Sequence, residues 1–276
     1  MKMGLRLHDS IKGTLEERLR FVGEQGYACA HLAMSKVLPD FRMADAPEKL
    51  SRPEFAESIR RPFEKTGLDL ALLGCYMSLM DRDPEEVARI RKIYEAHIVF
   101  SKQVGAWMVG TETPAGPGSA FVNDAPKSEE ALLYFIDQLR PIVRRAEEED
   151  VILAIEPVFK HVVSTPERAE RVLDAIDSDH LRIIFDAVNL LGPENVNQRD
   201  RVIAEGLSRL GDRIALMHMK DYRLEADGSM PATACGTGEM DYSVLMRFAR
   251  ERDLSMTLEN TKPENAVAAR EFLLRS

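Results

Sequence analysis

VILAIEP, residues 151–157, is the first of four apolar runs in the second half of the chain that each close with a side chain able to bind a metal. The other three runs are LRIIFDAVN (181–189), RIALMHMKD (213–221) and LSMTLEN (254–260). Runs of this length between polar segments are typical of parallel strands buried on both faces. The closing side chains are Glu156, Asp186, His218 and Glu259. The carboxyl ends of the strands in a parallel barrel converge on one mouth, so we expect these four groups to meet there.

Strand-like and helix-like segments alternate along the whole chain. Four earlier strand candidates cover residues 3–9, 27–34, 68–77 and 106–114. Eight strand–helix pairs predict an α/β fold, a (β/α)8 TIM barrel that forms a single domain over residues 1–276. An open parallel sheet is the alternative, but no glycine-rich dinucleotide fingerprint follows the first strand, which weakens it.

Three segments between the predicted strands are less regular. We expect residues 35–46 to form an irregular loop, and Pro53 and Pro62 to break the helical pattern of residues 48–66. A loop rich in Gly, Pro, Ala and Ser covers residues 114–126. Long loops after barrel strands tend to be functional, so we expect this loop to be functional.

The bulk composition limits the partners. The 276 residues carry a formal net charge of −9, which argues against a protein that binds the phosphate backbone of nucleic acids. Three cysteines without a CxxC pair indicate a reduced, cytoplasmic protein. The N-terminus has no long apolar segment of a signal peptide, and no run approaches 18 apolar residues, so we expect no membrane association.

The four closing side chains offer three carboxylates and one imidazole. This set suits a hard or borderline divalent ion such as Mn²⁺, Mg²⁺ or Co²⁺, with Zn²⁺ also possible. For any one of them alone, a capped or salt-bridged strand end is the simpler interpretation. For four on successive strands the metal is favoured, because crowded buried carboxylates repel one another and a cation resolves that conflict.

Several motifs of the chain resemble the xylose-isomerase-like barrel family of sugar isomerases and epimerases. They are EPVFKHVVSTPERA (156–169), IIFDAVNLL (183–191), MHMKD (217–221), CGTGEMDY (235–242) and TLEN (257–260). The resemblance implies one divalent ion, Mn²⁺ first, held by Glu156, Asp186, His218 and Glu259. It also implies that Glu156 and Glu259 perform acid–base catalysis beside the carbonyl of a keto-sugar or polyol, and that the chain associates with itself.

The resemblance also implies residues that contact the substrate. They are Asn189, His161, Glu112, Lys220, Arg223 and Tyr76. Asn189 departs from the family, which often has a histidine there, and it is equally interpreted as a cap of the following turn. The alternative for His161 is an exposed loop histidine. The alternative for Glu112 is a loop-capping carboxylate, and that for Lys220 is a surface ion pair. Asp221 is expected to orient a ligand, and the sequence leaves open whether His31 points into the barrel.

Three other functions compete with isomerisation or epimerisation. Dehydration of an inosose-like ring uses the same proton abstraction, followed by loss of hydroxide. A non-catalytic metabolite-binding barrel is possible, although the intact ligand set argues against it. Abasic-site endonucleases share this barrel, but their sites hold three metal ions and have more histidines at the strand ends. This chain has six histidines and a negative charge, and Tyr76 and Glu112 end strands three and four, so a DNA endonuclease is disfavoured.

The number of bound ions separates the isomerase from the nuclease. After equilibration with Mn²⁺ and removal of the excess, elemental analysis should find one ion per chain, because the residues supply one set of four ligands. Three ions per chain would contradict this expectation and favour the endonuclease.

Overall fold

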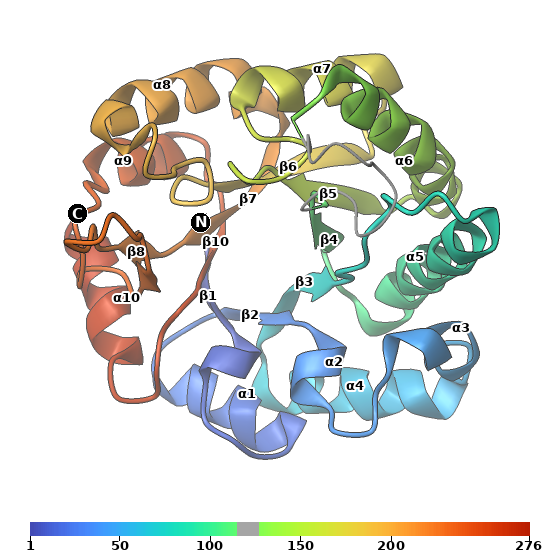
Figure 1. Ribbon diagram of the computed structural model, residues 1–276. Coiled ribbons are helices and arrows are strands. Elements are labelled where there is room, and N and C mark those ends of the chain that lie inside the picture. Colours follow the sequence, from blue (N-terminus) through green and yellow to red (C-terminus); the bar gives the residue numbers. More distant parts are fainter. Residues whose placement is uncertain (115–126) are drawn as a thin grey trace.

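The computed structural model describes residues 1–114 and 127–276, and its parallel strands close into a barrel in the order β1-β10-β7-β6-β5-β4-β3-β2 (Figure 1). The barrel strands are β1 (Met3–Arg6), β2 (Cys29–Leu32), β3 (Asp69–Gly74), β4 (Met108–Glu112), β5 (Ile152–Glu156), β6 (Leu181–Asp186), β7 (Ile214–Met219) and β10 (Met256–Leu258). The predicted (β/α)8 barrel is therefore confirmed, and the open sheet is wrong.

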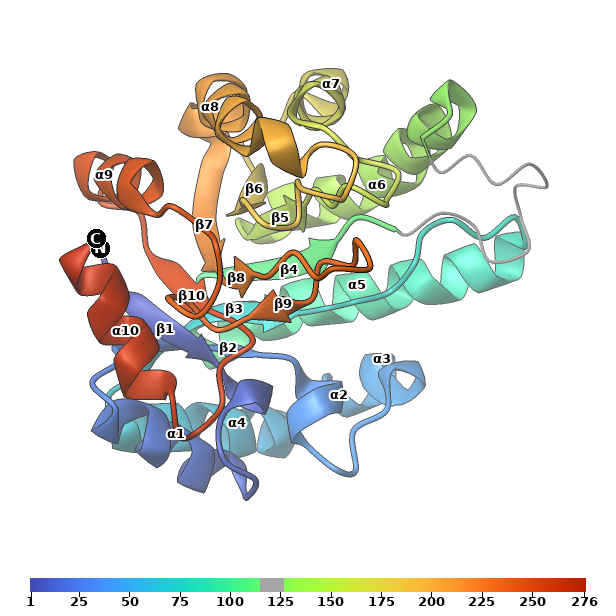
Figure 2. The same ribbon diagram turned by 60° about the vertical axis from the view of Figure 1, so that its left-hand side comes forward.

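Helices surround the barrel. They are α1 (Leu15–Glu24), α2 (Met34–Val37), α3 (Ala46–Lys49), α4 (Pro53–Thr66), α5 (Pro84–Val104), α6 (Glu129–Glu149), α7 (Pro166–Ile176), α8 (Arg199–Leu210), α9 (Ser243–Glu251) and α10 (Ala266–Arg275). After β7, a two-stranded hairpin forms from β8 (Asp221–Tyr222) and β9 (Ala232–Thr233). Figure 2 shows the hairpin reaching to the same side as the loops after β5 and β6, with both chain termini on the other side.

Local sequence signals explain where several helices begin and end. Thr14 and Glu17 form a reciprocal capping box at the start of α1. The side chain of Asp83 accepts a hydrogen bond from the backbone of the second residue of α5, and a proline follows it at the first helical position. Gly67 and Gly105 end α4 and α5 in the left-handed conformation, which glycine adopts without a steric penalty.

Two of the expected irregularities differ from the structure. Residues 35–46 contain the single turn α2 and a short 3-10 turn at Met43–Asp45 rather than an entirely irregular loop. The helical pattern is interrupted before Pro53 as expected, since α3 ends at Lys49 and α4 begins at Pro53, but Pro62 lies inside α4 and the helix continues past it. Burial of Ile59 and Phe63 against the barrel outweighs the loss of one backbone hydrogen bond. Residues 115–126 of the predicted functional loop lie outside the described residues.

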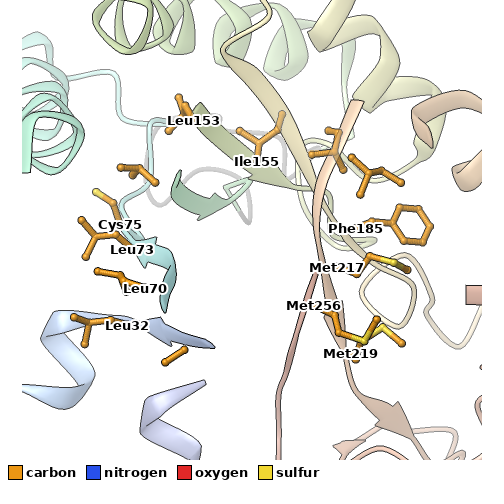
Figure 3. Close-up of a cluster of buried hydrophobic side chains, with 14 of the residues drawn as sticks. Leu32, Leu70, Leu73, Cys75, Leu153, Ile155, Phe185, Met217, Met219 and Met256 are labelled. Atoms are coloured by element: carbon orange, nitrogen blue, oxygen red, sulfur yellow. The ribbon is translucent and has the colours of Figure 1, made fainter. Parts of the chain in front are cut away.

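Side chains of strands β3 to β7 belong to two separate apolar clusters, one on each face of the sheet. The larger cluster lies between the strands and the helices and includes Leu153, Phe185 and Met217, which are labelled in Figure 3. A second cluster is formed by Leu72, Met108, Ala154, Ile184 and Leu216 inside the barrel. Side chains of a strand alternate between its two faces, so the residues two positions further on also point inward.

The inner cluster alternates large and small side chains. Gly110 has no room for a larger residue, because a Cβ there would lie 2.4 Å from Leu72 Cδ1 and 2.8 Å from Ile184 Cδ1. Above this layer, strand register places Glu112 beside Glu156 and Asp186 beside His218. The tightly packed layer therefore forms the floor beneath the predicted site.

The composition predicted unpaired cysteines and no membrane-spanning segment. Cys29, Cys75 and Cys235 are all buried and unpaired. None of the helices in the two described segments has the length and apolar composition that crossing a bilayer requires.

Shortening a side chain of the inner layer should destabilise the barrel. Ile184 is fully buried, so Ile184→Ala should lower the free energy of unfolding by about 2–5 kcal/mol through lost burial and the cavity left behind. Urea unfolding measures the loss. Val244→Ala removes methyl groups from a residue that is 39% exposed and should change stability by less than about 0.5 kcal/mol. Equal losses in the two variants would contradict the assignment of this layer.

Candidate active site

The four closing side chains converge at the carboxyl mouth of the barrel. His218 Nδ1 lies 3.1 Å from Glu156 Oε2 and 3.3 Å from Glu259 Oε1. Donor atoms of Glu156, Asp186 and His218 lie within 4.8 Å of one another. All four residues are buried, with exposed fractions between 1% and 4%. Four residues from four strand ends thus share one water-poor volume.

Two permanent cations lie against the carboxylates. Lys220 Nζ is 2.9 Å from Asp186 Oδ2 and 3.3 Å from Glu259 Oε2. Arg6 Nη1 is 3.0 Å from the same oxygen of Glu259. Burial alone would raise the pKa of Glu259, but the charges of His218, Lys220 and Arg6 hold it below its usual value. Glu259 is therefore ionised at neutral pH.

The protonation state of His218 depends on the net charge of the groups around it. Lys220 contacts Asp186 and Glu259, and Arg6 is shared between Glu259 and Asp9, so carboxylates outnumber these two cations around a neutral imidazole. Burial opposes protonation of His218, but the charges of Glu259 and Glu156 raise its pKa to about 9. In the metal-free protein, a proton on His218 takes this position, which a bound cation would otherwise fill.

The donor set fits a divalent metal ion. The described residues contain two overlapping groups that could hold one, Glu156–Asp186–His218 and His31–His218–Glu259. His218 Nε2 is buried and has no hydrogen-bond partner in the described parts of the chain. Three carboxylates with one imidazole form the mixed oxygen and nitrogen set that borderline divalent ions accept.

Asn189 takes part in the turn after β6 and also contacts a proposed metal ligand. Its backbone N–H donates to Asp186 Oδ1 at 3.0 Å, which closes the turn after β6. Its side-chain Nδ2 donates to Glu156 Oε1 at 2.6 Å. One oxygen of Glu156 is thereby held by Asn189 and the other by His218, so the carboxylate has a defined orientation.

Glu112, His161 and Tyr76 lie around this centre. Burial and the negative charge of Glu156 raise the pKa of Glu112 to about 7, although its side chain still reaches solvent in the mouth. Half-buried His161 has its pKa lowered by loss of hydration. The Tyr76 hydroxyl lies 2.9 Å from His31 Nε2, and burial followed by the charge of Glu259 raises the pKa of Tyr76 well above its usual value.

Lys220 and Arg223 have opposite surroundings. Lys220 is only 7% exposed, so the surface ion pair suggested as an alternative is wrong. Arg223 is exposed and donates from Nε to the Thr237 carbonyl at 2.8 Å. The structure does not bring Arg223 to the carboxylates, because its side chain turns toward the loop that follows the hairpin.

Asp221 shapes the loop that follows the hairpin. Its carboxylate accepts hydrogen bonds from the backbone N–H groups of Gly236, Gly238 and Met240 at 3.1, 2.9 and 2.9 Å. Gly238 must lack a side chain, because a Cβ there would lie 2.0 Å from the Tyr222 carbonyl oxygen. The CGTGEMDY motif therefore encodes a tight loop built around one buried carboxylate.

Sequence reasoning missed Arg6 and left His31 undecided. The His31 ring stacks on His218 at a centroid distance of 5.4 Å and an interplanar angle of 9°. Arg6 and His31 are register partners on β1 and β2, so both point into the barrel beside the predicted ligands. Their position at strand ends was the available signal, but neither residue closes a long apolar run.

Comparison with known proteins places the chain among barrels of one kind. A model of the xylose isomerase-like TIM barrel family matches residues 19–275. No curated protein sequence matches the chain. The solved structures reported below are each less than 25% identical in sequence to the chain. They therefore establish a shared fold and nothing beyond it.

Three solved structures illustrate the likeness. The 3-keto-D-glucoside 4-epimerase YcjR from E. coli has a TM-score of 0.77 at 16% identity, with 100% of both chains covered. The probable 3-DHS dehydratase AsbF from Bacillus anthracis has a TM-score of 0.75 at 14% identity and 99% coverage of both chains. The IOLI protein, solved with a bound zinc atom, has a TM-score of 0.68 at 18% identity, covering 100% of this chain and 96% of that one.

The raised pKa of His218 leads to a testable titration. In metal-free protein, the imidazole NMR signals of His218 should titrate near pH 9, because two carboxylates stabilise the charged ring. A raised folded-state pKa adds stability that is complete below the unfolded value of 6.5 and is lost as the pH rises through about 9. Unfolding measured across this range should show the same loss.

A matched pair of variants tests the cause of this shift. Glu156→Gln should move the pKa of His218 down, because it removes one of the two carboxylate partners. Glu225→Gln makes the same change at an exposed position and should leave the titration in place. A pKa of His218 at or below 6.5 in the unmodified protein would show that the carboxylates do not dominate.

Proposed function

The chain belongs to the xylose isomerase-like TIM barrel family, and we propose that it is a divalent-metal-dependent enzyme that isomerises or epimerises a keto-sugar or related polyol. The observation that carries this proposal is the pair Glu156 and Glu259, both in contact with His218 at the barrel mouth. The epimerase YcjR, whose fold this chain shares, acts on a keto-sugar derivative and supports the choice of substrate class.

Glu156, Asp186, His218 and Glu259 would hold the ion. When bound, a divalent cation supplies electrophilic stabilisation of negative charge on the oxygens of the substrate. Mn²⁺ is the proposed ion, and the zinc atom of the IOLI protein shows that a protein of this fold binds a divalent metal. The preferred ion and the self-association of the chain are predictions of the family resemblance.

Proton transfer is assigned to the two glutamates. One carboxylate removes the proton from the carbon beside the carbonyl, so the C–H bond breaks and its electron pair moves onto the carbonyl oxygen to give an enediolate. The other carboxyl group returns a proton, to the opposite face of the same carbon or to the neighbouring carbon. Glu259 is ionised at neutral pH and so is available as the base.

The surrounding cations suit the charge that develops during this step. Lys220 and Arg6 contact Glu259, and in the proposed reaction they would face the negative charge that develops on the substrate. Fixed charges in a buried site stabilise such an intermediate more strongly than water does. Asn189 keeps Glu156 in one orientation, which restricts the face from which that carboxylate acts.

The same site supports dehydration as the second candidate. Abstraction of the same proton, followed by departure of hydroxide from the next carbon, would convert the reaction into a lyase reaction. The probable dehydratase AsbF shares the fold and motivates this alternative. Glu112 supplies a carboxyl group with a pKa of about 7 that could protonate the departing hydroxide.

Removing one proposed proton carrier should stop exchange of the substrate's α-proton. With Mn²⁺ and a panel of keto-sugars and inososes in D₂O, NMR should detect deuterium at the carbon beside the carbonyl. Glu259→Gln should slow this exchange by about 10²–10⁴-fold, because an amide cannot accept the proton.

The control is Glu225→Gln, the same carboxylate-to-amide change at an exposed position of the hairpin, which should exchange as fast as the unmodified protein. Exchange of the α-proton at the unmodified rate in Glu259→Gln would contradict the two-glutamate mechanism. Loss of water from the substrate, seen as a new unsaturated product, would select the dehydratase. Binding without any exchange would select a metabolite-binding barrel.

A further inference from the structure

A pocket with largely apolar walls lies beside the proposed catalytic centre. It has a volume of about 250 Å³ and lies between the loop after β5, the loop after β6 and the β8–β9 hairpin. Its apolar walls include Val158, Phe159, Val188, Leu191 and Met230. Two further lining side chains, Lys160 and Ser229, are exposed and belong to its rim.

The wall formed by Phe159 is held in place by several contacts. The backbone N–H of Phe159 donates to the Asn189 carbonyl at 2.6 Å, which joins the two loops. The ring packs directly on Gly192, where a Cβ would lie 2.4 Å from two ring carbons. The Lys127 ammonium lies 3.7 Å from the ring centroid. The pocket is therefore a formed feature and not a gap between loose loops.

Asn189 joins this pocket to the reacting groups. It lines the pocket and also donates from Nδ2 to Glu156 Oε1. A molecule that touches Asn189 from the pocket therefore lies one side chain away from a proposed proton carrier. The pocket is therefore adjacent to the proposed catalytic centre.

The chemistry of the walls determines what would bind there. Sugar hydroxyls buried against Phe159, Leu191 and Met230 would lose their hydrogen bonds to water without replacement, which is costly. An apolar group gains about 25 cal/mol for each Å² removed from water. A cavity of about 150 Å³ lined by such residues holds a benzene molecule, so about 250 Å³ accommodates a ring-sized group.

We propose that this pocket binds an apolar, ring-sized substituent of the substrate, so that the enzyme prefers a substituted sugar or polyol such as an aryl glycoside over the free sugar. The proposal rests on the proposed function for the placement of the sugar ring in the barrel mouth. The pocket then selects the substrate by its substituent, while the carboxylates act on the ring.

Binding of unreactive glycosides tests this subsite without turnover. The probes are phenyl and methyl D-glucopyranosides, both anomers of each, titrated into the full-length protein with Mn²⁺ and followed by calorimetry. For at least one anomer, the phenyl glycoside should bind at least about tenfold more tightly than its methyl counterpart, because the ring buries apolar surface.

Ala232→Trp fills the pocket from the hairpin, where Ala232 is exposed and lines the cavity. This variant should bring the ratio of the two dissociation constants close to one. Ala226→Trp places the same side chain on an exposed position of the hairpin that does not line the pocket, and it should keep the tenfold preference. Phe159→Ala removes a wall and should also reduce the preference. Melting temperatures show whether each variant is folded.

Two results would overturn the proposal. One is equal affinity for the phenyl and methyl glycosides, including the absence of binding by both. The other is a phenyl preference that persists in folded Ala232→Trp and Phe159→Ala. These readouts are independent of proton exchange, so a failure of the isomerase mechanism would leave the phenyl preference intact, and a failure of the subsite would leave exchange intact.

Discussion

Electrostatic repulsion among three buried carboxylates is the constraint on which the rest of the site depends. Glu156, Asp186 and Glu259 are brought together by strand ends, where little water is available to screen them. Lys220 and Arg6 offset part of this charge, and His218 takes up a proton or yields its nitrogen to a cation. This charge balance suits the proposed divalent-ion site, because a cation would offset the remaining negative charge.

The barrel separates the rigid and the variable parts of the site. Ile184 and Leu216 in the inner layer lie directly beneath Asp186 and His218 on the same strands, so core packing holds the acid and imidazole groups. Asn189 and the walls of the neighbouring pocket come from loops. Loops tolerate change more readily than strands, so we infer that the chemistry resides on the strands and the choice of substrate on the loops.

Backbone donors also shape the mouth. Asp221 gathers three N–H groups of the loop after the hairpin, and Asp186 gathers the N–H groups of Val188 and Asn189. These carboxylates satisfy donors that would otherwise be unpaired beside the site. Asp221 therefore stabilises a loop, whereas Asp186 stabilises its own turn and is also a proposed metal ligand. In the sequence, both residues follow apolar strand runs.

Apolar runs that alternate with helical segments, together with the closing Glu156, Asp186, His218 and Glu259, were sufficient to predict the parallel barrel and the meeting of these four groups. That inference succeeds because an apolar strand and an amphipathic helix are each recognised from local sequence, and because parallel strands share one carboxyl end. The sequence alone did not reveal that Arg6 and His31 join them, that Arg223 turns away, or that Pro62 remains inside α4. Those outcomes depend on register between strands and on packing between segments distant in the chain, and only the closed tertiary structure decides them.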